Sequence, residues 1–556
     1  MKKTNKYIYL GVVGLLSLCS CNDFLDKMPD NRIDPSTPKQ LQLMLVDGYS
    51  DADYASMCEI SSDNVVDNHT PDEKGQSYPN LQSYTPILDQ YYAWEDANLD
   101  NQQDSPTYVW SGYYHAIAVA NHVLDKIDEV RANYPSDEDQ AKLDAVYGEA
   151  LLIRAYHHFL LVNLFSMQYG VNSSTDMGIP YCTEPETQVK VDYDRGNVAQ
   201  VYENIEKDLV EGLKYVNEGY YTQLRFHFNL AAANAFAARF YLYKRDYDKV
   251  EEYASKALGA DPSSKTRIDY WKQNYTSLGA DASTFYSSSS ANNFLLVPKM
   301  GMIFYYVCNG GARYANNREA SVATLYGSGP VWEKYLPVMI SRLYVNGKQA
   351  YGLWPSWMYR FFEYDDKVAG IGYPHRMCAE FTGEDALLMR AEARIFKGNL
   401  PGAVEDLNTW VQSHDTSNNI DELTADIITS YYRQRTVQSD SRDPIPYVTP
   451  DLHIDEVCNP VNPAYTVTDE KLPYLWCMLH FRRIETVFSG MRWFDIKRYG
   501  LEITHRIGRT ESRTLSTFDL RRAFQVPTES LEAGLEPTPR ATAPSSESSQ
   551  VRFVVD

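Results

Sequence analysis

The chain has 556 residues, enough to bury a large core, and its apolar content of 44% is that of a globular protein rather than a disordered one. The formal net charge of −22 argues against a nucleic-acid partner, because no net positive field is available to displace counterions from phosphates. It also argues against adsorption to an anionic lipid surface. Tyrosine is abundant at 44 residues, and its flat ring with a polar tip suits surfaces that bind sugars or proteins.

Residues 1–20 predict a secretory signal peptide. Three lysines precede an apolar run, Ile8–Leu18, which is too short to cross a bilayer of about 30 Å as a helix. The run ends in Leu18-Cys19-Ser20-Cys21, which looks like a bacterial lipobox, so Cys21 is the expected lipidation site, with palmitate among the acyl groups. An acyl anchor would then hold an acidic domain at a membrane surface. The alternative is a plain secretory signal with an incidental cysteine.

The cysteines that remain after Cys21 are widely spaced and form no CxxC pair, so neither a zinc site nor a redox motif is indicated. We expect mostly buried free thiols, although a disulfide is possible outside the cytoplasm. These residues are Cys58, Cys182, Cys308, Cys378, Cys458 and Cys477.

Residues 21–36 form an extended, polar leader, and Thr37–Met44 predicts a first helix. From Asp51 to Pro106 there is little helical periodicity, and Asp, Asn, Ser, Pro and Tyr dominate. Loops of this length are usually functional. This segment is therefore the first place in the chain to look for a binding site.

Helical periodicity then returns in several blocks. The blocks are Tyr108–Arg131, a helix ending near Phe165, Val198–Val216 and Tyr474–Ser489. Between them, Leu230–Pro262 contains two helical patterns that meet at a polar turn and carry small residues where the helices would cross. Its spacing resembles that of a tetratricopeptide repeat of about 34 residues, although an ordinary helical hairpin would show a similar pattern. Glu384–Ser413 repeats this pattern, so the two hairpins flank an inserted region.

The inserted region, residues 263–383, has scattered aromatic residues and one candidate strand at Phe294–Val297. We therefore predict a mainly α fold that contains tetratricopeptide-repeat-like hairpins and a loop-rich insertion. Residues 37–535 would form a single domain. Residues 536–556 are rich in Pro, Ser and Thr and predict a flexible tail, within which Val551–Val555 could add an edge strand.

No catalytic motif is present: the sequence has no GxSxG, HExxH, P-loop or GxGxxG. His157 and His158 are adjacent, and neighbours on a helix point to different faces, so we expect no metal site there. With 74 Asp and Glu residues, any acid–base pair chosen from sequence alone is meaningless. The sequence predicts no catalytic residue, no metal and no cofactor.

The aromatic residues indicate sugar binding. A pyranose ring packs its C–H face on a flat Trp or Tyr ring, while its hydroxyls need Asp, Asn or Arg nearby. Trp94 is the leading candidate platform, with the polar partners Asp63, Asp96 and Asn98. The other aromatic candidates are Tyr91 and Tyr92 in the same segment and Trp271, Tyr286, Trp332, Trp354 and Trp357 in the insertion.

Each of these aromatic side chains could instead belong to the core or to a docking surface. Some residues favour the core outright, because they sit in helical patterns: Trp110, Trp410, Trp476 and Trp493. Three arginines in the helical blocks predict packing and ion pairing rather than ligand binding: Arg154, Arg390 and Arg482.

Several stretches resemble the SusD/RagB family of outer-membrane nutrient-uptake lipoproteins. They are Cys21–Asp26, Glu149–Tyr169 with Gly178-Ile179-Pro180, Val201–Leu209, Leu388–Asn408 and Phe481–Gly500, which together span nearly the whole mature chain. The end departs from the family pattern: Arg521–Pro527 stands where an Arg-x-x-Pro-Ile-Pro-like segment is usual, and the tail is longer.

The resemblance implies a fold in which four tetratricopeptide-repeat-like helical hairpins form a right-handed scaffold with a loop-rich insertion. It also implies a non-enzymatic surface lipoprotein that captures oligosaccharides and hands them to a SusC-like TonB-dependent transporter, with the lipid anchor in the outer membrane. Two alternatives remain open. One is a RagB-like lipoprotein of the same fold that captures peptides. The other is a surface glycan hydrolase, against which the missing catalytic motifs argue.

Overall fold

A computed structural model describes residues 35–69, 85–97, 101–186, 192–271, 278–308, 312–321, 323–325, 327–333, 342–346, 349–355, 357–415, 420–433, 448–508 and 510–540. Cys21, Asn98 and the candidate strand Val551–Val555 lie outside these residues. For Trp271 and Trp354 the backbone is described but the side chain is not.

Helices dominate the described chain, which confirms the mainly α prediction. The α-helices are α2 (Pro38–Met44), α3 (Ala55–Ile60), α4 (Ile87–Tyr92), α5 (Pro106–Asn133), α6 (Asp137–Phe165), α7 (Val198–Gly212), α8 (Leu230–Tyr243), α9 (Tyr247–Leu258), α10 (Ile268–Trp271), α11 (Leu278–Phe285), α12 (Ile303–Tyr306), α13 (Arg318–Ser321), α14 (Gly383–Lys397), α15 (Leu400–Ser413), α16 (Ala425–Arg433), α17 (Ile454–Val457), α18 (Leu472–Glu485), α19 (Met491–Arg498) and α20 (Thr528–Glu532). Short 3₁₀ turns are η1 (Glu218–Tyr220), η2 (Leu224–Phe226), η3 (Pro262–Lys265) and η4 (Leu520–Arg522).

The strands are β1 (Val66–Asp67), β2 (Asn293–Lys299), β3 (Tyr314–Ala315), β4 (Arg342–Asn346), β5 (Gln349–Trp354), β6 (Phe361–Asp366), β7 (Ile371–Thr382), β8 (Ile503–Ile507) and β9 (Glu511–Leu515). The predicted strand Phe294–Val297 is confirmed as the buried centre of β2. All pairings are antiparallel: β1 with β3, β4 with β5, β8 with β9, and a three-stranded sheet in the order β2–β7–β6.

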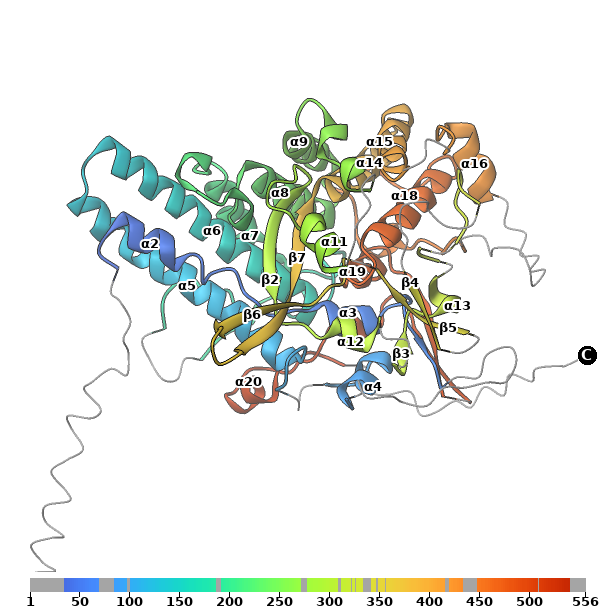
Figure 1. Ribbon diagram of the computed structural model, residues 1–556, viewed down its shortest axis with the longest axis horizontal. Helices are drawn as coiled ribbons and strands as arrows, with labels where there is room; N and C mark the ends of the chain where they lie inside the picture. The colour runs from blue at the N-terminus through green and yellow to red at the C-terminus, as the bar shows by residue number, and fades with distance from the viewer. Residues whose placement is uncertain are drawn as a thin grey trace, which may run out of the picture.

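The helices form packed antiparallel neighbours on both sides of the three-stranded sheet. Figure 1 shows the long helices α5, α6 and α7 at the left, α16 and α18 at the right, and β2 and β7 upright between them. The helix α6 packs against both α5 and α7, and α18 packs against both α14 and α16. The sheet therefore stands between two groups of helices, α5–α7 on one side and α16 with α18 on the other.

The two repeat-like hairpins are confirmed as α8–α9 and α14–α15. Asn229 and Asp246 cap the N-termini of α8 and α9, each accepting a backbone N–H three residues on. At the second hairpin Gly398 ends α14 with φ of +80°, a conformation that glycine adopts without steric cost. Because α14 packs directly on α9, two hairpins far apart in sequence become neighbours in space.

The segment from Asp51 to Pro106 differs from the expected long loop. It contains α3 and α4, and the side chains of Tyr91 and Tyr92 on α4 are buried. Each of these helices has only six residues, too few to produce a periodic pattern that a sequence window can detect. Tertiary packing holds them, since isolated helices this short are not stable in water.

Ion pairing accounts for the helix-borne arginines, as expected from the sequence. Arg154 binds Asp208 through two contacts of 2.7 Å, and Arg390 binds Asp406 in the same bidentate way. Arg482 reaches Asp495 at 2.9 Å and also contacts Glu392. The four tryptophans expected in the core are buried, and the six described cysteines are free thiols.

The start of the predicted C-terminal tail contacts the body of the molecule. Residues 536–540, the first part of the segment expected to be flexible, contact the body: Arg195 Nη1 donates to the Glu536 carbonyl, and Arg540 Nε lies 2.6 Å from Asp96 Oδ1.

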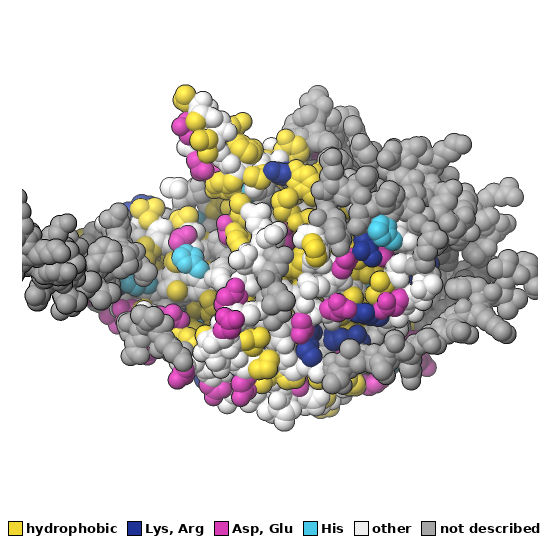
Figure 2. Space-filling model, turned by 90° about the horizontal axis from the view of Figure 1, so that it is seen from below, with side chains coloured by type: hydrophobic (Ala, Val, Ile, Leu, Met, Phe, Trp, Pro, Cys, Tyr) yellow, Lys and Arg dark blue, Asp and Glu magenta, His cyan; other side chains and the backbone are white. Residues whose placement is uncertain are grey.

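Figure 2, seen from below, shows a projection above the body at the horizontal position where Figure 1 draws β6. No helix among the described residues is long and apolar enough to cross a membrane.

Candidate functional site

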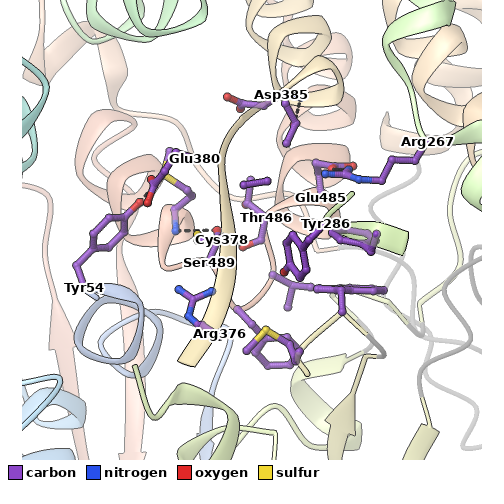
Figure 3. Close-up of a pocket in the computed structure, with 18 of the residues that line it drawn as sticks. Tyr54, Arg267, Tyr286, Arg376, Cys378, Glu380, Asp385, Glu485, Thr486 and Ser489 are labelled. Atoms are coloured by element: carbon purple, nitrogen blue, oxygen red, sulfur yellow. Dashed lines mark hydrogen bonds and ion pairs between the residues drawn. The ribbon is translucent and has the colours of Figure 1, made fainter. Parts of the chain in front are cut away.

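A cavity that we call the central pocket lies beside β7 (Figure 3). Its walls come from the residue before α3, the end of α11, the Trp357–Met358 turn, β7, and the turn between α18 and α19. The space between its walls measures about 820 Å³, open solvent included. The lining residues are Tyr54, Arg239, Arg267, Phe285, Tyr286, Trp357, Met358, Arg376, Cys378, Ala379, Glu380, Thr382, Asp385, Glu485, Thr486, Val487, Phe488, Ser489 and Met491.

Strand β7 supplies one side of the pocket through its alternation. Successive side chains of a strand point to opposite faces, so Arg376, Cys378 and Glu380 share one face. The strand is fixed by its pairing with β2, in which Val297 lies opposite Cys378. At its end Thr382 Oγ1 accepts the Asp385 N–H and caps α14, so strand and helix are joined without a loop. The pocket side of β7 is therefore held rigidly.

Aromatic side chains form the opposing wall. The rings of Phe285 and Trp357 are nearly parallel, with 5.5 Å between centroids and 15° between planes. Tyr286 packs edge-on against Phe285, and the Arg267 guanidinium lies 4.3 Å from the centre of the Phe285 ring. Figure 3 shows Tyr286 beside β7. Flat apolar rings beside polar groups are the arrangement that accommodates a sugar ring.

Each pocket arginine is matched by a carboxylate. Arg376 binds Asp53 at 2.5 and 2.8 Å, Arg239 Nη2 lies 2.8 Å from Asp385, and Arg267 Nη1 lies 2.7 Å from Glu485.

Burial by itself raises the pKa of Asp53, but Arg376 outweighs it and holds that pKa below its ordinary value. The pKa of Glu485 is likewise lowered, to about 2, because His414 and Arg267 outweigh its burial. The charges of the pocket thus largely cancel in pairs.

Uncommitted polar groups remain for a ligand. The hydroxyl of Tyr286 makes no hydrogen bond within the described part of the chain. The Ser489 hydroxyl donates to the Thr486 carbonyl and keeps its acceptor lone pairs. Burial raises the pKa of the Cys378 thiol to about 12, so this group is a neutral thiol rather than a thiolate nucleophile. The pocket is thus suited to binding through ring contact and hydrogen bonds.

A second cavity, the lateral pocket, has a more polar lining. It is lined by Asp63, Val65, Val66, Asp67, Asn68, Tyr92, Asn317, Ala320, Ala323, Arg483, Thr504, His505 and Arg506. Asp63 is bound by Arg492 through two contacts of 2.8 Å and by Arg483 at 3.3 Å, and the two arginines hold its pKa below the ordinary value although burial raises it.

The ring of Tyr92 is covered in the lateral pocket by His505, at 4.1 Å, and by Tyr314, at 4.6 Å. Both of its faces are therefore occupied by the protein's own rings. Among the described residues that line this cavity, no ring offers an open platform.

The prediction that Trp94 is an open platform is wrong for this structure. Only 4% of its surface is exposed, its ring stacks on His505, and its Nε1 donates to the Ser61 carbonyl at 2.9 Å. Tyr91 is also buried, with its hydroxyl donating to the Asp104 carbonyl. Asp96 pairs with Arg540. Trp94 and Tyr91 are therefore packing residues beneath the surface, whereas Asp96 is exposed.

Only some of the aromatic candidates in the insertion line the central pocket. Tyr286 and Trp357 are brought together in the central pocket. Trp332 is not: its Nε1 donates to the Gly327 carbonyl, and its ring packs 5.7 Å from Phe481. Trp271 ends α10 and Trp354 ends β5, with side chains outside the description.

The sequence reasoning missed most of the central pocket. Tyr54, Arg239 and Arg376 come from three segments that no local pattern links. Phe285 is directly adjacent to Tyr286, and that pair at a helix end is a signal that was available. Arg376 and Cys378 alternate in a strand, but that strand lacked a recognisable apolar pattern because its outer half is exposed.

Comparison with known proteins gives a consistent result. Residues 23–242 match the model of a SusD-like family described as "Starch-binding associating with outer membrane". No curated protein matches the sequence significantly.

Solved structures match the fold at low identity. A putative sugar binding protein from Bacteroides vulgatus has a TM-score of 0.62 and 17% identity, over 91% of this chain and 99% of that one. A SusD superfamily protein from Bacteroides thetaiotaomicron has a TM-score of 0.60 and 17% identity, over 91% of this chain and 100% of that one. A SusD-like carbohydrate binding protein from Bacteroides vulgatus has a TM-score of 0.54 and 14% identity, over 90% of this chain and 97% of that one.

Proposed function

Because this chain is a SusD-like family protein, we propose that it captures an oligosaccharide in the central pocket and passes it to a partner TonB-dependent transporter. The chain would act at the surface of the outer membrane, anchored through lipid on Cys21. Binding would occur without turnover of the glycan.

The observation that carries this proposal is the aromatic wall. Trp357 and Tyr286 border a cavity whose other sides carry hydroxyl, carboxylate and guanidinium groups. Phe285 covers one face of the Trp357 ring and holds its orientation. A sugar ring would pack against Trp357 and Tyr286, with its hydroxyls bonded to the Tyr286 and Ser489 oxygens.

The matched charges favour a neutral ligand over the peptide alternative. A peptide brings charged termini, and these need an unpaired arginine or carboxylate for capture. In the central pocket Arg376, Arg239 and Arg267 are already bound to carboxylates at 2.5–2.8 Å. We therefore place neutral oligosaccharides ahead of peptides as the ligand class.

The test is a binding screen of the purified chain against neutral glycans, acidic glycans and a peptide library, followed by calorimetry on each hit. We expect a neutral oligosaccharide to bind, and Trp357→Ala to reduce its affinity at least about tenfold. Binding of peptides alone would replace the glycan proposal with peptide capture. Release of shorter products from a bound glycan would support the hydrolase alternative instead.

Delivery needs its own test. The tagged chain, purified from outer membranes of the source cells, is expected to bring a TonB-dependent transporter with it. Growth on the bound glycan is expected to require both proteins.

A further inference from the structure

The hairpin formed by β6 and β7 is the largest cluster of exposed apolar side chains in the described chain. Val368 at its tip is 99% exposed and Ile371 is 61% exposed. Phe362, Tyr364 and Tyr373 on the two strands are exposed as well. In Figure 2 the projection that stands above the body is coloured mainly for hydrophobic and acidic side chains.

The β6–β7 hairpin, which we call the arm, is well structured although it projects from the body of the molecule. Asp366 Oδ1 accepts the N–H groups of Val368, at 2.8 Å, and of Ala369, at 3.0 Å, which fixes the turn. Gly370 follows with φ of +68°. At Gly372 an added Cβ would lie 1.9 Å from the Glu363 carbonyl oxygen, so the close strand pairing there requires glycine. The exposed apolar groups are therefore presented by a built structure and not by a loose loop.

Both faces of the arm are apolar. Side chains at paired positions of an antiparallel ladder share a face. Tyr364, opposite Gly372, and Phe362, opposite Pro374, lie on one face. Tyr373 is opposite Glu363 and lies on the other face with Ile371, two residues before it in the same strand.

The outer part of the arm has only two strands, since the pairing of β2 with β7 ends at Lys299 and Arg376. Two-stranded hairpins with exposed apolar groups are marginally stable in water, so a covering partner is expected. An arm that is apolar on both faces fits into a cleft rather than lying on a flat surface.

The charge of the arm indicates which kind of partner would cover it. Glu363, Asp365 and Asp366 lie on the arm against a single Lys367, which gives it a net negative charge. Inserting a tip that carries these charges into a bilayer core is costly. A second copy of this chain, with a formal charge of −22, would be repelled. A protein cleft with apolar walls and a rim of Lys and Arg complements both properties.

We propose that the β6–β7 hairpin is a docking arm that inserts into an apolar, basic-rimmed cleft of a partner protein. The proposal rests on the proposed function in one respect, because the partner used to test it is the TonB-dependent transporter. The arm is also continuous with the binding site, since β7 runs from the tip at Ile371 to the central-pocket residues Arg376 and Glu380. Docking the arm would place the pocket next to the partner.

The test compares three tagged full-length chains purified from outer membranes. One is unaltered, one carries Phe362→Ser, Tyr364→Ser, Val368→Ser and Ile371→Ser, and the matched control carries Val448→Ser and Val461→Ser, two exposed apolar positions elsewhere. We expect the arm variant to recover at least about tenfold less transporter than the other two chains. Its thermal unfolding midpoint and its affinity for the glycan identified in the screen should be unchanged.

The contradicting outcomes are distinct. Equal recovery of transporter by the arm variant overturns the docking arm and leaves the proposed function intact. If the unaltered chain recovers no transporter, delivery and the docking arm both fail, while glycan binding is judged separately by calorimetry. Arm-dependent binding of the Cys21→Ser chain to phosphatidylethanolamine–phosphatidylglycerol vesicles, or arm-dependent dimerisation by light scattering, would replace the protein cleft with a membrane or a second copy.

Discussion

The indole ring of Trp94 stacks on the imidazole ring of His505, with 4.3 Å between centroids and 23° between planes. On its other side His505 stacks on Tyr92 at 4.1 Å. Its two nitrogens face the carbonyls of Tyr92 and Ser62 at 2.7 and 2.9 Å. This stack joins α4 to β8, two elements far apart in the sequence, so Trp94 acts as a packing residue between them.

Replacing Trp94 should therefore reduce stability and leave ligand affinity unchanged. We expect Trp94→Ala to lower the free energy of unfolding by about 3–5 kcal/mol, as for other large buried aromatic side chains. Trp94→Phe, which keeps a ring against His505, should cost less. Urea unfolding measures the first effect, and calorimetry with the bound glycan measures the second. A folded Trp94→Ala protein with weakened glycan binding would return Trp94 to the binding site.

The buried pair Arg376–Asp53 should behave as a unit. Arg376→Met leaves a buried carboxylate without its partner, which typically costs about 3–5 kcal/mol. Adding Asp53→Asn removes that charge, so the double variant should recover a large part of the loss. A double-mutant cycle by urea unfolding measures the coupling. Additive effects of the two substitutions would show that the contact contributes nothing specific.

Glu59 should make stability depend on pH. This buried carboxyl accepts the N–H groups of Phe488 and Gly490, yet burial raises its pKa from 4.5 to about 7. The pKa of Glu59 is higher in the folded chain than in the unfolded chain. The contribution of its protonated carboxyl to the stability of the fold is therefore fully present below pH 4.5 and is lost as the pH rises through about 7.

The measurement is urea unfolding of the unaltered chain and of Glu59→Gln across this pH range. The free energy of unfolding of the unaltered chain, minus that of Glu59→Gln, should fall by about 3 kcal/mol as the pH rises from the unfolded to the folded pKa. Other groups titrate in both proteins and cancel in the difference. A constant difference across the range would contradict a raised pKa at Glu59.

The hydroxyl of Tyr286 should contribute directly to ligand binding. Tyr286→Phe keeps the ring of the aromatic wall and removes one hydrogen-bonding group, so we expect a loss of about 0.5–1.5 kcal/mol in glycan binding. Tyr364→Phe on the exposed arm is the matched control and should bind normally. Equal affinities of all three proteins would exclude the Tyr286 hydroxyl from the site.

The helical scaffold could be predicted because its signals are local. The α8–α9 hairpin has small residues at the crossing, the capping residues Asn229 and Asp246, and a short polar turn, all within one stretch. The same signals recur at α14–α15. Periodicity and capping arise between residues a few positions apart, so a single sequence contains them.

The site could not be predicted in the same way. Trp94 stood in polar sequence without core periodicity, which favoured exposure, but its environment is set by His505, 411 positions later in the chain. The pocket residues Tyr54, Arg239 and Arg376 likewise meet only in the folded chain. Tyr286 and Trp357 were among the aromatic candidates, but nothing local separated them from Trp332, whose ring is packed against Phe481.

The central claim is that the pocket beside β7 binds the sugar, and a crystal structure of the chain with the oligosaccharide found by the screen tests it most directly. The account predicts a sugar ring packed against Trp357 and hydrogen-bonded to the Tyr286 hydroxyl. A well-ordered glycan bound in the lateral pocket or elsewhere, with the central pocket empty, would contradict it.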